Sequence, residues 1–144
     1  MDSVYRVVLL SAAALIAGCA AQTVIQPAAA GLPASRVATI VPAQRAKIGG
    51  SVSLARVTDA QGTDAVHYNM LTADVRNKAI VIPGRYEIGV ICVRATEMYS
   101  PSATFELRGG YTYTMECNRS SAFLIGVITT EAPTAHTDSE ALVR

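Results

Sequence analysis

Two stretches of the chain alternate apolar and polar residues in the same way, at an interval of 25 residues. In each, a Gly-x-Tyr sequence opens an alternating segment that ends at a cysteine, over residues 84–92 and 109–117. Because side chains on a strand point alternately to its two faces, each segment is predicted to bury one apolar face. The residues on these faces are Tyr86, Ile88, Val90 and Cys92 in the first segment and Tyr111, Tyr113, Met115 and Cys117 in the second. Val93, Thr112 and Glu116 fall at the alternate positions and are predicted to point outward.

The turns that precede the two segments have matching chemistry. Pro83 fixes φ for the corner of a turn, while Gly84 can adopt a positive φ. Arg-Gly-Gly at residues 108–110 gives comparable freedom before the second segment. Apolar residues also alternate on the way into each turn, over 80–82 and 105–107. The sequence therefore predicts two β-hairpins.

Further segments with strand-like patterns flank this pair. Residues 36–41 and 48–57 are the best candidates before it, and a turn is predicted at residues 59–62. Residues 63–77 give a mixed pattern, which fits either a short helix or an irregular strand. The apolar run in residues 122–130 predicts a final strand that is buried in the core. If that strand were exposed instead, it would be an edge that recruits a partner.

About seven short strands separated by Gly and Pro turns predict an all-β fold. The expected architecture is a small antiparallel sandwich, immunoglobulin-like or transthyretin-like in general form, with one domain over residues 37–130. Residues 19–36 are rich in alanine and interrupted by proline and glycine, so they are predicted to be a disordered tether. Residues 131–144 are polar and are predicted to be a disordered tail.

An apolar run from Val7 to Ile16 is about half as long as a helix that spans a bilayer. The run ends in Leu-Ile-Ala-Gly-Cys at residues 15–19, which resembles the lipobox of bacterial lipoprotein precursors. The resemblance implies a signal peptide over residues 1–18 and a mature chain that begins with Cys19, carrying diacylglyceryl and N-acyl groups. Ala20, in place of Asp, implies the outer membrane, with the domain in the periplasm. The alternative is a conventional signal peptide or a buried apolar helix with an incidental cysteine.

Cys92 and Cys117 occupy the same position in the two segments, and both positions are expected to be buried. With Cys19 assigned to lipid, only these two thiols remain, and an oxidising periplasm lets them pair. We predict a disulfide between them, which the chain-entropy model makes worth about 3 to 4 kcal/mol. The alternative is two unpaired buried thiols that act as small hydrophobic groups. A redox role is less favoured because the chain has no Cys-x-x-Cys.

The chain carries 12 Lys and Arg against 11 Asp and Glu, a formal net charge of +1. This balance gives no field to attract nucleic acid, so no nucleic-acid partner is expected. Basic residues concentrate in the first part of the chain; we interpret them as solvated strand faces, or alternatively as a patch for anionic wall or lipid A. His67 and His136 lie far apart, and no metal-ligand spacing or nucleophile with an adjacent base is present. The prediction is therefore a protein without catalytic residues, metal, cofactor or small-molecule substrate.

Pro-Gly-Arg-Tyr-Glu-Ile-Gly-Val at residues 83–90 resembles the turn and strand of PEGA-type surface modules and of many bacterial lipoproteins. The resemblance implies a non-catalytic envelope module. We therefore predict a lipid-anchored binding or scaffold protein at the periplasmic face of the outer membrane, in contact with another envelope protein. The alternative is a periplasmic inhibitor that inserts a loop into a wall-degrading enzyme. Tyr99, expected in the exposed connection between the two alternating segments, is the predicted partner contact.

Overall fold

The computed structural model describes residues 22–44, 49–67, 76–119 and 125–134. They form ten β-strands and two single-turn 3-10 helices, η2 (Pro27–Ala29) and η3 (Ala34–Arg36). The strands are β1 (Gln22–Ile25), β2 (Ala38–Pro42), β3 (Ser51–Asp59), β4 (Asp64–His67), β5 (Arg76–Val81), β6 (Gly84–Arg94), β7 (Glu97–Tyr99), β8 (Ser102–Leu107), β9 (Tyr111–Arg119) and β10 (Ile125–Pro133). Cys19 and His136 lie outside the described residues.

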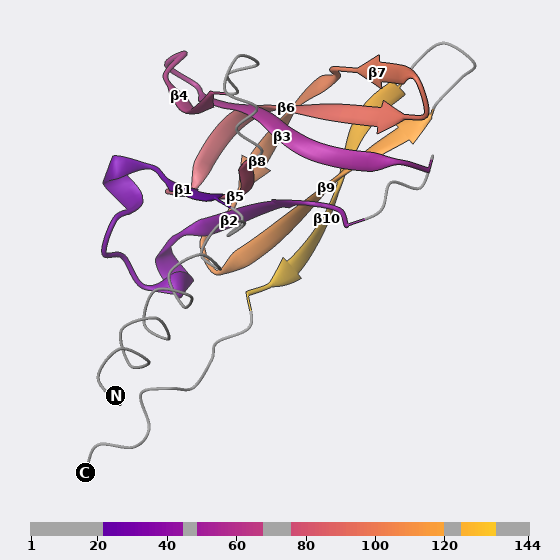
Figure 1. Ribbon diagram of the computed structural model, residues 1–144. Coiled ribbons are helices and arrows are strands. Elements are labelled where there is room, and N and C mark those ends of the chain that lie inside the picture. Colours follow the sequence, from indigo (N-terminus) through magenta and orange to yellow (C-terminus); the bar gives the residue numbers. More distant parts are fainter. Residues whose placement is uncertain (1–21, 45–48, 68–75, 120–124, 135–144) are drawn as a thin grey trace, which may run out of the picture.

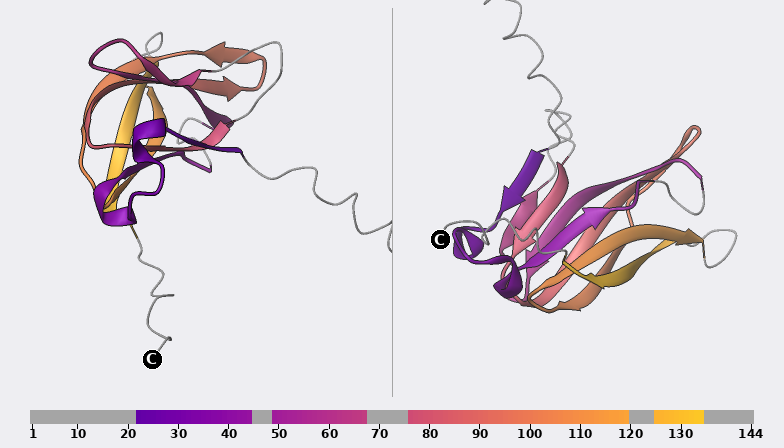
Figure 2. Two further views of the ribbon diagram at one scale, coloured as in Figure 1. Left: turned by 90° about the vertical axis from the view of Figure 1, so that its left-hand side faces the viewer. Right: turned by 90° about the horizontal axis from the view of Figure 1, so that it is seen from below.

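The strands are arranged as two facing layers (Figures 1 and 2). Hydrogen bonds connect them in the order β10-β9-β2-β5-β3-β6-β7, with β1 on β5, β4 on β3 and β8 on β6. The path bends between β5 and β3, where only Leu54 and Arg76 are paired in register. One layer therefore holds β3, β4, β6, β7 and β8, and the other holds β1, β2, β5, β9 and β10. The prediction of a small all-β sandwich is confirmed.

Most strand pairs are antiparallel, as predicted, but two are parallel. β2 runs parallel to β9, and β1 runs parallel to β5. Parallel neighbours need a long connection between them, and nothing in the local sequence pattern reveals such a pair. The described residues also form more strands than the seven expected. The additional ones, β1, β4 and β7, are each only three or four residues long, which is too short for a clear alternating pattern.

The two predicted hairpins are wrong, since neither Gly-x-Tyr turn joins strands that pair with each other. β5 pairs with β1, β2 and β3, whereas β6 pairs with β3, β7 and β8. β8 likewise pairs with β6, whereas β9 pairs with β2 and β10. Both turns therefore carry the chain from one layer to the other. An alternating pattern fixes which face of a strand is buried, but it does not fix the neighbour to which the strand bonds.

The two alternating segments supply the facing halves of the core, as predicted. Tyr86, Ile88, Val90 and Cys92 of β6 and Tyr113, Met115 and Cys117 of β9 are all buried, whereas Tyr111 is half-buried. Val93 is exposed, as expected. Glu116 departs from the prediction, because only 8% of it is accessible although it lies on the outer face of β9. Thr112 on the same face is half-buried. The outer side of this layer is therefore partly covered.

The folded domain begins earlier than the sequence suggested. Residues 22–36, assigned above to the tether, form β1, η2 and η3, so the sandwich starts at Gln22 rather than at residue 37. Val24 packs against the core and Ala29 is buried. The segment has few bulky apolar residues, and its backbone pairs with β5, which composition does not reveal. At the other end, β10 reaches Pro133, opposite Tyr111, so part of the predicted tail is also folded.

Three further sequence predictions can be compared with the structure. The turn at residues 59–62 is present, and the Asp59 side chain accepts hydrogen bonds from the backbone N–H groups of Gln61 and Thr63 at 2.9 and 2.8 Å. Within the ambiguous residues 63–77, β4 and the start of β5 are strands, and residues 68–75 lie outside the described part. The final strand is found as β10 at one end of the sheet path. The predicted burial of its apolar run falls on side chains that the structure does not describe.

Candidate partner-binding site

The predicted disulfide between Cys92 and Cys117 is present and joins the two layers. The Cα atoms of the two cysteines are 6.2 Å apart, and both residues are fully buried. Their meeting follows from the two layer-crossing turns. Gly84 is in register with Leu107, so both turns lie at the same end of the sandwich, and β6 and β9 leave that end in facing layers. Because the cysteines occupy the same position in the two segments, they come together in the core.

The strand that carries Cys92 ends in a tight hairpin at the edge of the sheet. We call residues 93–99, the end of β6 with β7, the edge hairpin. Arg94 is in register with Glu97, which leaves Ala95 and Thr96 as the loop. Ala95 has φ = 51°, a left-handed conformation that short hairpin loops demand and that is unusual for alanine. β7 stands at the end of the sheet path, as Figure 1 shows.

Tyr99 lies on this hairpin, in the connection between the two alternating segments as predicted, but it is less exposed than the sequence suggested. It is the last residue of β7, in register with Cys92, and its ring is half-buried against the core. The phenol donates a hydrogen bond to the Glu97 carboxylate, with 2.7 Å between Oη and Oε2. Tyr99 therefore fastens β7 to the sandwich and presents only part of its surface.

The large exposed apolar side chains of the edge hairpin are Val93 and Met98. They are in register with each other on neighbouring strands, with 38% and 60% of their surface accessible. Side chains of such a directly opposed pair touch across the strands, so they form one apolar surface. Arg94 and Glu97 are also exposed, but strand alternation turns this pair to the opposite face of the hairpin, where Glu97 accepts the hydrogen bond from Tyr99. The alternation of residues 84–92, extended by one position, signalled Val93 as an apolar residue on an outward face.

A second cluster of polar groups lies at the start of β6, around Tyr86. The Tyr86 hydroxyl is 3.1 Å from Gln26 Oε1 and 3.0 Å from the Ile82 carbonyl oxygen. Gln26 Oε1 also accepts a hydrogen bond from the Ile82 N–H, at 3.0 Å. Burial raises the pKa of the Tyr86 hydroxyl, partly opposed by its contact with Gln26 and aided by the negative charge of Asp59. Each of these polar groups ties β1 or a turn to β6, which is a structural task.

The remaining hollows of the described surface offer no group of catalytic side chains. One hollow, of about 570 Å³, is lined by Val41, Pro42, Ala43, Gln44, Val52 and Thr114. A hollow of about 500 Å³ is lined by Leu32, Ser35, Arg36, Ile82, Pro83 and Gly109. Neither set of lining residues contains a nucleophile beside a base. The polar group around Tyr86 comes closest to such a cluster, but its hydrogen bonds hold strands and turns together. Among the described residues, no three His, Cys, Asp or Glu side chains are grouped to hold a metal ion.

None of the helices in the described part of the chain has the length and hydropathy to cross a membrane. The fold and the edge hairpin define this molecule as a disulfide-linked, all-β sandwich with an exposed apolar pair at one sheet edge. No protein family model, curated protein or solved structure matches the chain.

Proposed function

We propose that this protein is a lipid-anchored envelope protein, a non-catalytic binding or scaffold module at the periplasmic face of the outer membrane. In this proposal it contacts another envelope protein through the edge hairpin. The observation that carries the proposal is the exposed pair of Val93 and Met98 on a sheet edge. The disulfide at Cys92, directly beside Val93, joins the base of this hairpin to the opposite layer.

The apolar pair is suited to be the centre of a small interface. Fully burying a Val or Met side chain contributes about 1.5 to 3 kcal/mol. Because Val93 and Met98 are already partly buried, a partner that covers them gains a fraction of this free energy from each. Residues at the centre of an interface contribute most when the contacts around them exclude water. A preorganised hairpin also loses little conformational entropy on binding.

The proposed anchor rests on the lipobox-like sequence that ends at Cys19. A lipidated cysteine with several acyl chains holds a protein at a bilayer stably, because each buried methylene contributes about 0.8 kcal/mol. Anchoring also raises the effective concentration of the domain near a partner in the same membrane. The disulfide supports the periplasm as the location of the domain, because disulfides persist in oxidising compartments.

The test is photo-crosslinking in intact cells of the source bacterium or a close relative. A benzophenone amino acid at Met98 is compared with the same group at Thr130, an exposed position on β10 in the other layer. We expect the Met98 position to form one specific adduct with an envelope protein, and Met98→Asp to abolish its co-purification. Adducts at Thr130 but none at Met98, in a protein that fractionates with the outer membrane, would refute the edge hairpin as the contact.

The second candidate is a periplasmic inhibitor of a wall-degrading enzyme. It is favoured by the shape of the edge hairpin, which ends in the short loop of Ala95 and Thr96 and is braced from behind by a disulfide. The crosslinked partner discriminates between the two functions. An adduct with a lysozyme, together with inhibition of that enzyme that Met98→Asp removes, identifies the inhibitor. An adduct with a non-enzymatic envelope protein identifies the scaffold.

A further inference from the structure

We propose that the outer face of the β1–β5 pair lies against the bilayer, with Ile25 in the lipid headgroup region. This face consists of Thr23 and Ile25 on β1 and of Lys78 and Ile80 on β5, and we call it the membrane face. The inference rests on the proposed lipidation of Cys19, and it adds the surface of the domain that the membrane contacts and the orientation that results.

The first argument is the length of chain between the anchor and the folded domain. β1 begins at Gln22, three residues after Cys19. Three extended residues reach at most about 11 Å, so the start of β1 stays within about that distance of the lipidated cysteine. The tether predicted over residues 19–36 would have allowed that freedom. Because residues 22–36 are folded, β1 is instead the part of the sandwich nearest to the lipid.

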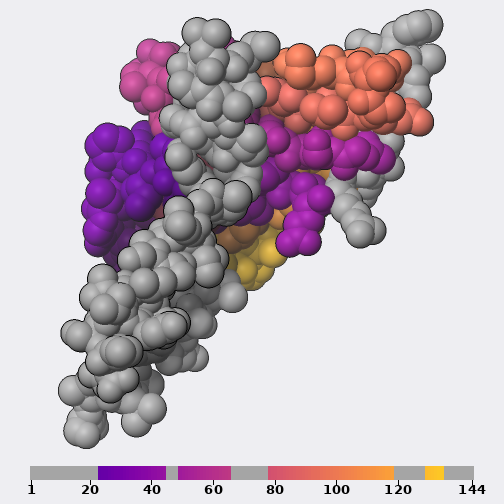
Figure 3. All heavy atoms as spheres, in the orientation of Figure 1, coloured from indigo at the N-terminus to yellow at the C-terminus, as the bar shows by residue number. Residues whose placement is uncertain are grey.

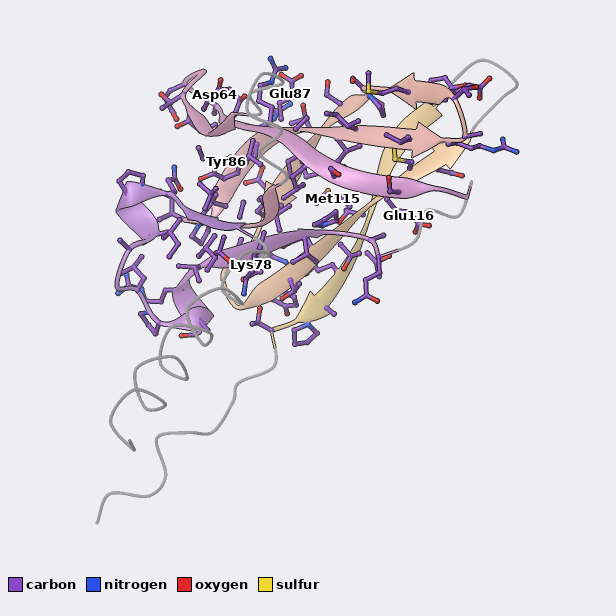
Figure 4. All side chains as sticks on the ribbon, viewed as in Figure 1. Asp64, Lys78, Tyr86, Glu87, Met115 and Glu116 are labelled. Carbon is purple, nitrogen blue, oxygen red and sulfur yellow. A yellow bond between two sulfur atoms is a disulfide. The ribbon has the colours of Figure 1, made fainter. Side chains whose placement is uncertain are left out.

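The second argument is the composition of the membrane face. Ile25 is 50% exposed on β1, and its register partner on β5 is Ile80, which is half-buried. Thr23 is in register with Lys78, nearer to the anchor, and Figure 4 labels Lys78 on this side of the molecule. An apolar residue beside a lysine suits the bilayer interface, where the ammonium group meets lipid phosphate and the apolar side chain meets the acyl boundary.

The third argument is the position of the edge hairpin relative to this face. β6 starts beside Gln26, through the contact between Tyr86 and Gln26, and it runs to Arg94 at the hairpin. The seven residue steps from Tyr86 to Val93, the register partner of Met98, span about 23 Å along the strand. In Figure 3, β1, η2 and η3 lie at the left in indigo, and the orange region that includes the edge hairpin lies at the upper right. The edge hairpin belongs to the layer opposite β1 and β5, so with the membrane face on lipid it lies on the periplasmic side of the sandwich.

The absence of tryptophan from the sequence makes the proposal directly testable. Ile25→Trp and Met98→Trp each place a single fluorescent reporter at an exposed apolar position. The lipidated full-length mature proteins are reconstituted into vesicles of phosphatidylethanolamine and phosphatidylglycerol, with and without brominated acyl chains. We expect brominated lipid to lower the emission of Ile25→Trp at least about twofold and to leave Met98→Trp unchanged, since interfacial residues sit within quenching distance of the acyl chains.

Two controls separate failure of this inference from failure of the proposed function. Mass spectrometry reports acylation of Cys19, and flotation reports whether the vesicles hold the protein. If the protein is acylated and floats but Ile25→Trp is quenched no more than Met98→Trp, the membrane face is refuted and the lipid anchor stands. If Cys19 carries no lipid and the protein does not float, the anchor and the membrane face are both refuted. Formation of the disulfide in each variant, measured by mass, verifies that the domain has folded.

Discussion

Removing the disulfide between Cys92 and Cys117 should destabilise the domain by an amount that the loop length sets. The disulfide closes a loop of 25 residues, for which the chain-entropy model gives about 3.5 kcal/mol at 25 °C. Small domains are stable by only about 5 to 15 kcal/mol, so this loss is a large share of the total. It corresponds to a fall in the thermal midpoint on the order of 20 °C for a domain of this size.

The measurement is urea unfolding of the nonlipidated protein that starts at Ala20, in oxidised form and after reduction in denaturant and refolding with reductant. With an m-value of about 1.5 kcal/mol/M, the midpoint should fall by about 2 M. The double variant Cys92→Ala/Cys117→Ala should lose the same energy plus about 1 to 2 kcal/mol for two buried sulfur atoms, and it should ignore reductant. If the reduced and oxidised proteins unfold at the same urea concentration, the entropic reasoning is refuted.

Three further predictions concern single positions. Ala95→Gly should raise the free energy of unfolding by about 0.5 to 1 kcal/mol, because glycine adopts the left-handed conformation of this residue without strain, and an unchanged or lower urea midpoint would contradict this. Gly109→Ala should lower that free energy by about 1 to 3 kcal/mol in the same assay, since a Cβ there would lie 2.8 Å from the Ser35 carbonyl oxygen; a neutral effect would contradict it. Burial raises the pKa of Tyr86, so its contribution to stability is fully present below the unfolded pKa of about 10 and is lost as the pH rises through the folded pKa. Stability should therefore fall above pH 10, and Tyr86→Phe should flatten that fall; parallel pH profiles for the two proteins would contradict the assignment.

The buried faces of β6 and β9 could be predicted because strand alternation is a local property. Each position from Tyr86 to Cys92 needs only its own polarity and the period of two to be assigned to the core. The disulfide could be predicted for a related reason, because the two cysteines occupy the same buried position in the two alternating segments. The compartment inferred from Cys19 supplied the remaining condition.

The pairing of the strands could not be predicted, because it depends on neighbours far away in the chain. A Pro-Gly turn at residues 83–84 is equally compatible with a hairpin and with a crossing between layers, and the structure has the crossing. β1 could not be predicted because it is only four residues long and its parallel partner β5 is more than fifty residues away in the chain. Met98 escaped because a strand of three residues is too short to show a period.

The exposure of Tyr99 could not be predicted from its place in the connection between the two alternating segments. A connection is expected to be exposed, and an aromatic residue there is the natural candidate for a partner contact. Tyr99, however, is in register with Cys92, so the alternation of β7 turns its ring toward the core and turns Met98 outward. A shift by one residue exchanges the two faces of a strand. The same rule places Val93 beside Met98, and this is why the proposed contact is a pair of aliphatic side chains rather than one aromatic ring.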